Sequence, residues 1–307
     1  MPSTLESLSN DLAGAVERAS GSVVAIHARR RIPASGVVWR KGLVVAADHT
    51  VHKEEDVRIS FADGTDVRAR VAGRDPGTDL CILRLPDDAR VSVAALNREP
   101  LRVGQLALTV GRPGETATAS LGVISVAGPE WRTWRGGRID QFIRLDVPVY
   151  DGFSGSPLVN ASGQIAGICT SGLARGAAVA VPTATIERVV DQLIAGGGTT
   201  RRGFLGIGTQ PVPLPDALRE RIGPVGGRVP TAGLMVVAVQ QGTSADRAGI
   251  LLGDLIVGLA GEPMEDARDV FAALGPESVG QELRATIVRA GAPMTVTITV
   301  DEHPARS

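Results

Sequence analysis

A serine between glycines, Ser154, is the residue whose surroundings first suggest chemistry. It lies in the segment Asp151-Gly-Phe-Ser-Gly-Ser-Pro157, directly before an apolar run. A serine hydroxyl attacks a carbonyl only when a base takes its proton and hydrogen-bond donors stabilise the oxyanion that forms. Because Gly152 can adopt backbone angles closed to other residues, the N–H groups of Gly152, Phe153 and Ser154 are candidate oxyanion donors. Taken alone, the segment is better explained as a glycine-rich turn, so a nucleophile needs support from a histidine and an acid elsewhere.

The candidate base is one of four histidines, and their surroundings separate them. His49 follows the apolar run 43–47, at the point where a strand would emerge from a barrel. His52 stands in a polar stretch and is expected to be solvated, while His27 ends a strand and His303 lies in the tail. A metal site built from His49, His52 and nearby carboxylates lacks a third ligand at a convincing spacing. We therefore predict His49 as the base and expect neither a metal nor another cofactor.

The candidate acid is Asp79, which stands at the mouth of the apolar strand predicted over 80–85. There its carboxylate could be shielded from water and could orient an imidazole. Asp75 lies in the preceding Asp-Pro-Gly turn, where an aspartate commonly serves the turn itself. The chain order His49, Asp79, Ser154 is the order of the chymotrypsin-type catalytic triad. In such a triad the histidine takes the serine proton and passes it to the leaving amine, and the aspartate holds the imidazole in the required tautomer.

Short β-rich runs dominate residues 21–181 and must position these three residues. About a dozen of them alternate with turn signals such as Asp63-Gly64 and Ser162-Gly163, with almost no helix between them. This pattern predicts an antiparallel barrel or sandwich, and the number of runs favours two. Apolar residues at helical spacing predict a helix over 3–19 and another directly after Pro182.

A linker and a second, smaller unit follow. Residues 196–202 are polar and glycine-rich without periodicity, as in a flexible linker. Beyond them, strand-like runs and two helical patterns indicate a small α+β domain. The sequence therefore predicts a mainly β protein with an N-terminal helical segment (1–20), a double antiparallel β-barrel (21–195), the linker and the α+β domain (203–303).

Composition and charge exclude several classes of function. The 307 residues carry a net charge of −1, which gives no electrostatic reason to expect nucleic acid or an anionic membrane surface as a partner. No apolar run approaches the ~20 residues of a membrane span, and no leader opens the sequence. The chain as written is thus expected to be cytoplasmic, or periplasmic (extracytoplasmic) if a leader has been removed. Cys81 and Cys169 lie in apolar runs and are expected to be buried free thiols.

The segments around the three candidate residues resemble those of the HtrA/Deg serine proteases. In chain order they are Asp48-His-Thr-Val51, Gly73-Arg-Asp-Pro-Gly-Thr-Asp79, Leu101-Arg-Val-Gly104 and Gly152-Phe-Ser-Gly-Ser-Pro-Leu-Val-Asn160. The second unit resembles the PDZ domain of that family. Its matching segments are the carboxylate-binding loop Arg202-Gly-Phe-Leu-Gly-Ile207 and the core segments Gly242-Thr-Ser-Ala-Asp-Arg-Ala-Gly-Ile250 and Gly253-Asp-Leu-Ile256. Several separated motifs in the right order, covering nearly the whole chain, make the resemblance specific.

The resemblance implies a fold, an activity and partners. The fold would be a chymotrypsin-like double β-barrel followed by a small α+β PDZ domain. The activity would be that of an ATP-independent serine endopeptidase acting on unfolded or damaged proteins, with the PDZ domain binding C-terminal peptides. The resemblance also implies a homo-trimer built through the protease domain and the N-terminal segment. The alternative is a non-proteolytic peptide-binding or holdase protein that carries a resting or inactive protease fold.

Four positions depart from the usual family pattern, and all of them flank the reactive groups. Phe153 replaces an asparagine before the serine, and Ser156 replaces a glycine after it. Asp151 replaces a proline, and Asp48 replaces the asparagine before the histidine. No reactive group is lost. The rebuilt oxyanion loop could however make the enzyme slow, or active only once a ligand is bound.

The resemblance also places the primary specificity pocket. Pro148, Val149, Ala178 and Val179 would line it, and no carboxylate stands at its expected base. Because these residues are small or apolar, we predict cleavage after small or medium aliphatic residues such as Val, Ala or Ile. Activity is expected to fall below about pH 6–7, where an imidazole takes up a proton.

A peptide-binding groove is expected in the second unit. Backbone N–H groups around Leu205 and Gly206 would receive a terminal carboxylate, and the following strand would pair with an extended peptide. The remaining residues of the predicted groove are apolar side chains of that entry segment and of the helix expected over 266–274, namely Phe204, Ile207, Val270 and Phe271.

Overall fold

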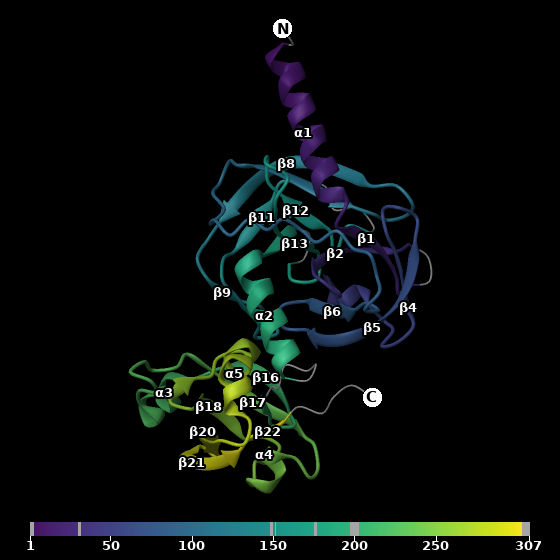
Figure 1. The fold of residues 1–307 in the computed structure, drawn as a ribbon. Coiled ribbons are helices and arrows are strands. Elements are labelled where there is room, and N and C mark those ends of the chain that lie inside the picture. Colours follow the sequence, from purple (N-terminus) through teal and green to yellow (C-terminus); the bar gives the residue numbers. More distant parts are fainter. Residues whose placement is uncertain are drawn as a thin grey trace. The chain divides into compact units, whose positions relative to one another are not determined.

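The fold is described from a computed structural model of the chain, over residues 3–29, 32–147, 150, 152–174, 177–196 and 203–302. Two compact units can be distinguished (Figure 1). The first comprises residues 1–133 and 137–200, and the second comprises residues 134–136 and 201–307. All three candidate triad residues therefore belong to the first unit.

Six antiparallel strands close the first barrel of this unit. In barrel order they are β1 (Val23–His27), β2 (Ala34–Arg40), β3 (Leu43–Ala47), β6 (Leu80–Arg84), β5 (Asp66–Asp75) and β4 (Val57–Ser60). Successive side chains of β3 face two different cores. Val44 and Ala46 pack inside the barrel with Ile26, whereas Val45 packs outside it. Because both faces of β3 are buried, its sequence is continuously apolar instead of alternating.

A second closed barrel has the same number of strands, again antiparallel. In barrel order they are β11 (Ile143–Leu145), β14 (Ala178–Pro182), β13 (Ile165–Thr170), β12 (Pro157–Val159), β7 (Leu106–Gly111) and β8 (Thr118–Ala127). Ala107, Leu158 and Ala178 are part of its interior. The short strands β9 (Trp131–Arg132) and β10 (Arg138–Ile139) pair only with each other among the described residues. The predicted double antiparallel β-barrel is confirmed.

The outer faces of the two barrels share one buried cluster. Val45 and Ile82 of the first barrel lie in it with Val110 and Val181 of the second. In this packing β13 lies against β3. The short helical turn η1 (Asp48–Thr50) directly follows β3 of the first barrel, whereas β13 belongs to the second barrel. The residues just beyond the ends of β3 and β13 therefore come from different barrels.

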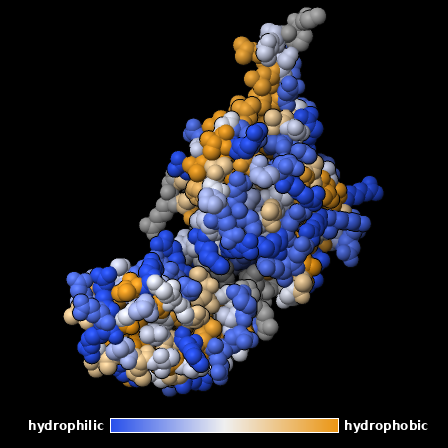
Figure 2. Space-filling model, turned by 90° about the vertical axis from the view of Figure 1, so that its left-hand side faces the viewer, coloured by the Kyte–Doolittle hydropathy of each residue, from blue (hydrophilic) through white to orange (hydrophobic). Residues whose placement is uncertain are grey.

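Two helices flank the barrels, as predicted. Helix α1 (Thr4–Ser20) begins after Ser3, whose hydroxyl oxygen accepts the N–H of Glu6 at 3.2 Å. Its C-terminal half packs on the unit, whereas its N-terminal half projects from it (Figure 1). Leu5 and Leu8 on that half are 79% and 45% exposed, and apolar surface runs along the helix (Figure 2). Helix α2 (Thr183–Ala195) follows β14 and packs on the barrels.

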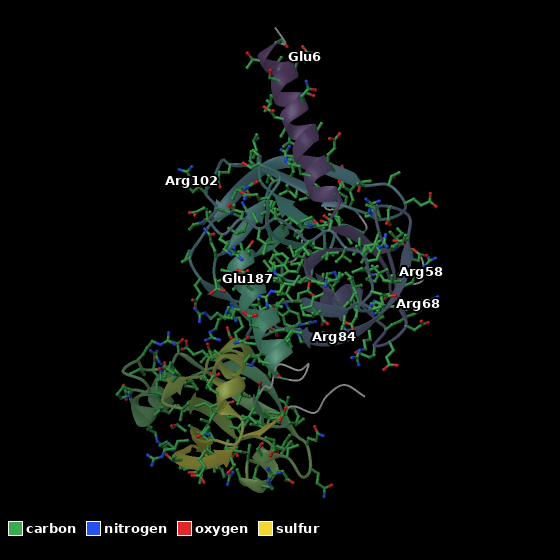
Figure 3. All side chains as sticks on the ribbon, viewed as in Figure 1. Glu6, Arg58, Arg68, Arg84, Arg102 and Glu187 are labelled. Atoms are coloured by element: carbon green, nitrogen blue, oxygen red, sulfur yellow. The ribbon has the colours of Figure 1, made fainter. Side chains whose placement is uncertain are left out.

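Charged side chains extend from the rim of the barrels into solvent, among them Arg58, Arg68 and Arg102 (Figure 3). Arg58 pairs with Asp66 at 3.5 Å, and Arg68 pairs with Asp56 at 3.2 Å. Exposed pairs of this kind stabilise a fold by at most ~1 kcal/mol each. The buried clusters, and not the surface charges, therefore hold the barrels together.

The second unit combines a sheet with short helices. Its elements are β15 (Gly203–Phe204), β16 (Ile207–Pro213), α3 (Asp216–Ile222), β17 (Ala232–Val239), α4 (Ser244–Arg247), β18 (Leu255–Leu259), β19 (Glu262–Pro263), α5 (Ala267–Ala273), η2 (Pro276–Ser278), β20 (Glu282–Arg289), β21 (Ala292–Thr299) and β22 (Asp301–Glu302). The sheet order is β16-β17-β18-β20-β21, with β19 beside β18, and β15 pairs with β22. Asp266 is the N-cap of helix α5, and its carboxylate and that of Asp269 form a capping box. These elements confirm the predicted α+β architecture.

Both cysteines are buried and free, as predicted. Burial raises the pKa of Cys81 and of Cys169 to about 12, so each thiol is neutral at physiological pH. Within the described residues, no helix combines the length and the apolar character needed to cross a membrane.

Candidate active site

The candidate base and acid form a closely bonded pair. The Nδ1 atom of His49 lies 2.7 Å from Oδ2 of Asp79, and the His49 backbone N–H donates to Oδ1 of the same carboxylate at 2.9 Å. Asp79 is only 2% exposed. A carboxylate bound at Nδ1 leaves the proton on that nitrogen and keeps Nε2 free to accept another. The pair therefore has the arrangement that a general base requires.

Asp79 is held from three sides, which explains how a carboxylate can be buried here. Its backbone adopts the left-handed conformation (φ 57°), which aspartate tolerates better than most residues. Its carbonyl accepts the N–H of Asp48 at 3.0 Å. The hydroxyl of Thr170, the last residue of β13, donates a short hydrogen bond to Oδ2. Residues of both barrels thus fix the carboxylate that fixes the imidazole.

Gly172 completes this environment because it leaves room for it. Its N–H donates to the Thr170 hydroxyl oxygen at 2.9 Å. A Cβ atom at this position would lie 2.6 Å from Oδ2 of Asp79 and 2.8 Å from Nδ1 of His49. Both distances are shorter than van der Waals contact, so only glycine fits beside the pair.

The candidate nucleophile lies next to this segment but points to another partner. The Ser154 hydroxyl is hydrogen-bonded to the hydroxyl of Ser171 at 3.1 Å. Among the described residues, no hydrogen bond joins Ser154 to His49. Ser171 stands between Thr170 and Gly172, both of which contact the acid–base pair. The structure therefore brings the three predicted residues to one place, with the serine side chain in a resting orientation.

The predicted oxyanion loop is anchored by Ser35 of β2. The Ser35 hydroxyl donates to the Gly152 carbonyl at 2.9 Å and accepts the backbone N–H of Arg112 at 2.9 Å. Gly152 has φ 89° and Gly155 has φ 90°, both in the region that favours glycine. A Cβ on Gly155 would lie 2.0 Å from the Ser35 carbonyl oxygen. The loop is thus shaped by close contact with the first barrel.

One predicted oxyanion donor is already occupied. The Phe153 N–H donates to the carbonyl of Tyr150 at 3.1 Å, which closes a tight turn. The Phe153 ring is buried and packs beside that of Tyr150, with ring centroids 5.6 Å apart. The prediction therefore narrows to the N–H groups of Gly152 and Ser154, because the Phe153 N–H is not available in this conformation. Asp151, which precedes Gly152, lies outside the described residues.

A small cavity opens beside Ser154 where the specificity pocket is expected. Ala178, one of the residues predicted for this pocket, lines it together with residues that were not predicted for it, namely Thr109, Val147, Phe153, Cys169, Thr170 and Ser171. Val179 does not reach it: neighbouring residues of β14 face opposite sides, and Val179 packs in the cluster between the barrels. Pro148 and Val149 lie outside the described residues.

A salt-bridge cluster that the sequence analysis missed clamps the segment carrying the histidine. Arg74 of β5 donates to Oδ1 of Asp48 at 2.7 Å, to Oε1 of Glu54 at 2.9 Å and to the Lys53 carbonyl at 3.1 Å. Asp48 is only 8% exposed. The residue before the histidine is thus tied to the neighbouring strand. The only available signal was the unusual aspartate at position 48.

Thr170, Ser171 and Gly172 were also missed. They follow the apolar run Ile165–Cys169, and a polar Thr-Ser-Gly sequence at a strand end is an ordinary turn signal. Nothing local distinguishes it from other turns in the chain. Its importance depends on the meeting of β13 with the end of β3, which is a property of the packed barrels.

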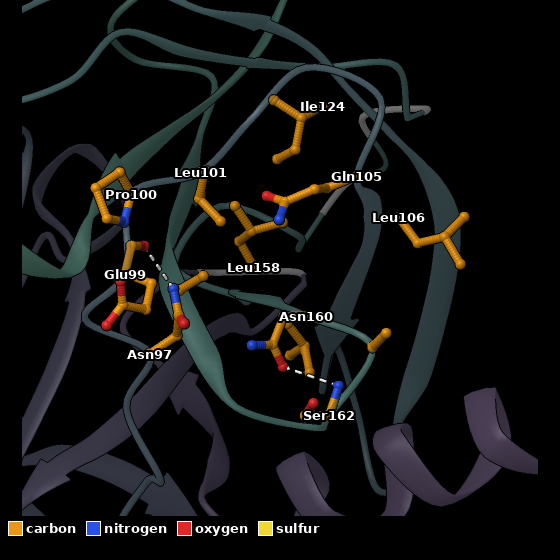
Figure 4. A pocket seen from close by; sticks show the side chains of 13 residues that line it. Asn97, Glu99, Pro100, Leu101, Gln105, Leu106, Ile124, Leu158, Asn160 and Ser162 are labelled. Carbon is orange, nitrogen blue, oxygen red and sulfur yellow. Dashed lines mark hydrogen bonds between the residues drawn. The ribbon is translucent and has the colours of Figure 1, made fainter.

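A larger cavity of about 260 Å³ lies elsewhere in the first unit (Figure 4). Two of its polar side chains are hydrogen-bonded to nearby backbone groups: Asn97 donates to the Glu99 carbonyl at 2.8 Å, and Asn160 accepts the Ser162 N–H at 3.0 Å. None of the three candidate triad residues lines it. Among the described residues, no cluster of three or more His, Cys, Asp or Glu side chains is arranged to hold a metal ion.

The residues predicted to bind a peptide in the second unit lie on and around β16 and α5. Strand β16 is at the edge of its sheet, and α5 packs beside it. Ile207 of β16 and Val270 of α5 are partly buried against one core, and Phe271 is 43% exposed. Phe204 ends β15, and its carbonyl accepts the Ser244 hydroxyl at 2.7 Å.

The loop before β16 has two backbone N–H groups that are candidates to bind a carboxylate. Leu205 is buried and Gly206 has φ 76°. Their carbonyls accept the N–H groups of Ala245 and Gln240, but no described residue accepts theirs. Two unpaired backbone N–H groups in one loop can bind an anion such as a carboxylate. This arrangement supports the predicted carboxylate-binding loop.

Family comparisons agree with both units. Residues 34–168 match the trypsin-like peptidase domain family, and residues 203–300 match the PDZ domain family. The chain thus combines a trypsin-like peptidase domain with a C-terminal PDZ domain.

Relatives cover both domains together. The chain is 33% identical over 284 residues to a protein of Rhizobium meliloti named "Probable periplasmic serine endoprotease DegP-like", and 31% identical over 274 residues to a protein of the same name from Chlamydia trachomatis. These alignments include 90% and 87% of this chain but 54% and 53% of the relatives. The chain therefore spans about half the length of the curated relatives it matches.

Solved structures give the same assignment. The serine endoprotease from Yersinia pestis superposes with a TM-score of 0.71 and 26% identity, covering 99% of this chain and 100% of that one. The HtrA-type protease AlgW with a decapeptide superposes with a TM-score of 0.70 and 25% identity, covering 96% and 99%. The chain belongs to the HtrA-type family of serine proteases with a PDZ domain, which confirms the resemblance found in the sequence.

Proposed function

We propose that this protein is an ATP-independent serine endopeptidase in which Ser154 is the nucleophile, His49 the general base and Asp79 the residue that orients it. The observation that carries this proposal is the bidentate contact between Asp79 and His49, with the Ser154 hydroxyl held on the adjacent Ser171. A buried carboxylate bonded to both the imidazole and the backbone of one residue fixes that imidazole for proton transfer.

The first chemical step begins when Ser154 turns from Ser171 toward Nε2 of His49. His49 takes the hydroxyl proton as Ser154 attacks the peptide carbonyl, and then gives that proton to the leaving amine. The N–H groups of Gly152 and Ser154 stabilise the oxyanion, and one such donor contributes about 3–4 kcal/mol to transition-state stabilisation. Ser35 holds the loop that presents them, through the Gly152 carbonyl. Water repeats the same steps on the acyl-enzyme.

The substrates that we propose are unfolded or damaged proteins, cleaved after small or medium aliphatic residues. The cavity beside Ser154 is small and is lined mainly by apolar or hydroxyl-bearing residues, so a long or charged side chain has no place in it. The PDZ domain would bind C-terminal peptides along β16, with the carboxylate at Leu205 and Gly206. The solved HtrA-type structures that contain peptides support a peptide ligand for this family.

We also propose an assembly and a compartment. The exposed apolar residues Leu5 and Leu8 on the projecting half of α1 suit contact with another copy, and we propose the homo-trimer that the resemblance implies. A periplasmic location is proposed because the DegP-like relatives are named periplasmic. Sedimentation analysis of the wild type and of a Leu5→Ser/Leu8→Ser double variant would test the assembly.

A fluorophosphonate probe combined with casein degradation tests the proposed activity. We expect labelling of Ser154 and loss of both labelling and degradation in the Ser154→Ala variant. His49→Ala should lose the activity while keeping the fold, as judged by its thermal unfolding. If the wild type is neither labelled nor active but still prevents aggregation of a reduced client protein, the protein is the holdase that the sequence left as the alternative.

A further inference from the structure

The cavity beside Ser154 contains a hydroxyl group that no other described group uses. Thr109 of β7 lines this cavity together with Cys169 and Ala178. Thr109 is 1% exposed, and its Oγ1 atom has no hydrogen-bond partner among the described residues. Buried polar atoms in folded proteins nearly always have a partner, because leaving one unpaired is destabilising. A ligand that fills the cavity and supplies this partner would remove the deficit.

Strand alternation shows which way the Thr109 side chain points. Its neighbours Leu108 and Val110 belong to the cluster between the two barrels, whereas Ala107 belongs to the interior of the second barrel. Since successive side chains of a strand face opposite sides, Thr109 shares the side of Ala107. Ala178 also belongs to that interior and lines the cavity. The unpaired hydroxyl of Thr109 therefore faces the same space as Ala178.

The other hydroxyl groups around the cavity are already paired. Thr170 donates to the carboxylate of Asp79 and accepts the Gly172 N–H. Ser171 is bonded to Ser154. In the resting structure, the hydroxyl of Thr109 is thus the one among the described lining residues that is left to contact a side chain that enters the cavity.

We propose that Thr109 is a specificity-determining residue, and that its hydroxyl selects threonine or serine immediately before the scissile bond. The inference rests on the proposed peptidase function and refines the prediction of aliphatic residues at that position. The resting cavity has a volume of about 20 Å³, which is the space that one water-sized group, such as a methyl or a hydroxyl, occupies. Threonine and valine have nearly the same shape, so the apolar walls accept both. Threonine alone pairs with the buried hydroxyl, and a site with a polar group rejects the analogue that leaves it unpaired.

The test compares peptides that differ only in the residue before the scissile bond, which is Thr, Val, Ser or Ala. The enzymes are the wild type, Thr109→Val, Thr109→Ser and a matched control, Thr118→Val. Thr118 is an exposed residue of the neighbouring strand β8, and its hydroxyl lies 3.4 Å from the Gly111 carbonyl. We expect the wild type to cleave the Thr peptide about fivefold to tenfold faster than the Val peptide in kcat/KM, as one added hydrogen bond allows. Thr109→Val should lose this preference, whereas Thr109→Ser and Thr118→Val should keep it.

A Thr-to-Val ratio of one or less in the wild type overturns the inference, and this result needs no variant to fold. A ratio that stays the same in Thr109→Val overturns it as well. Labelling of Ser154 by the fluorophosphonate probe separates this failure from failure of the proposed function. An enzyme that is labelled and cleaves the Val peptide but ignores the hydroxyl contradicts only the role of Thr109, whereas an unlabelled protein contradicts the peptidase activity itself.

Discussion

Gly172 stands so close to His49 that a methyl group cannot be placed between them, since a Cβ atom would lie 2.8 Å from Nδ1. The same atom would lie 2.6 Å from Oδ2 of Asp79. The backbone of the second barrel therefore forms one wall of the acid–base pair. An inserted methyl group must move the imidazole or the carboxylate.

The Gly172→Ala substitution is accordingly expected to lower kcat by about 100-fold or more, because a displacement near 1 Å in a catalytic group has effects of that size. Steady-state kinetics on a chromogenic peptide would measure the loss. Binding of a C-terminal peptide to the second unit serves as the control and should be unchanged. Retention of wild-type kcat in a folded variant would contradict the placement of the pair.

Substitution of Ser171 is expected to raise the reactivity of Ser154 instead of lowering it. In the resting structure its hydroxyl holds that of Ser154. Removing one neutral hydrogen bond shifts an equilibrium by about threefold to tenfold, so Ser171→Ala should raise the rate of fluorophosphonate labelling by about that factor. Time courses of labelling, quenched at successive times for the wild type and the variant, would measure this increase in rate. A slower rate in the variant would mean that Ser171 assists the nucleophile instead of restraining it.

Arg74 should act through the segment that carries the histidine. Its guanidinium joins Asp48 at 2.7 Å and Glu54 at 2.9 Å, on either side of His49 and the residues that follow it. Arg74→Met removes the guanidinium that pairs with the nearly buried carboxylate of Asp48, so we expect a loss of about tenfold to 100-fold in kcat with little change in KM. The double variant Asp48→Asn/Arg74→Met should recover part of the loss. If it is worse than the single variant, the pair has no positioning role.

The carboxylate-binding loop offers a prediction in the second unit. Gly206 has φ 76°, and a Cβ atom there would lie 2.3 Å from the hydroxyl oxygen of Thr243. Gly206→Ala should therefore displace the loop and weaken binding of a C-terminal peptide by at least about tenfold, which corresponds to 1.4 kcal/mol. Calorimetric titration would measure it, with Ser154 labelling as the control. Unchanged peptide affinity would place the binding site elsewhere.

The sequence was sufficient to predict the double barrel and the second domain, and it selected three candidate triad residues that lie close together in the structure. Continuous apolar runs such as β3 identify strands buried on both faces. The order of the candidate triad residues could be predicted because each of them lies close to one end of such a run. Val179 was misplaced because the facing of a strand residue depends on register, and a shift of one residue exchanges the two sides.

The residues that the sequence analysis missed have roles that depend on contacts between distant segments. Ser35 reaches Gly152 across 117 residues of sequence, and Thr170 reaches Asp79 across 91. Neither has a local signal, because a hydroxyl beside an apolar strand is common. The orphaned hydroxyl of Thr109 became visible only when its surroundings were packed. Such residues are found from three-dimensional structure and not from periodicity.

The stability of the second unit should depend on pH through Asp254. Its carboxylate is buried and accepts two hydrogen bonds from Arg289, at 2.8 and 2.7 Å, and one from the Leu251 N–H at 2.8 Å. The hydrogen bonds from Arg289, opposed by burial and aided by that from Leu251, hold the pKa of Asp254 below its ordinary value. Because the folded-state pKa lies below the unfolded one, the stabilisation is complete above about pH 4 and is lost as the pH falls through the folded value.

Asp254→Asn provides the test. An amide keeps the shape of the side chain but loses the charge-assisted bonds, so the variant should be less stable at pH 7 by roughly 1.5–3 kcal/mol. Its unfolding temperature should also fall less than that of the wild type between pH 5 and pH 3, which scanning calorimetry of the full chain would measure. The transition that a bound C-terminal peptide raises identifies the second unit. Equal pH dependence in the two proteins would assign the acid sensitivity to other carboxylates.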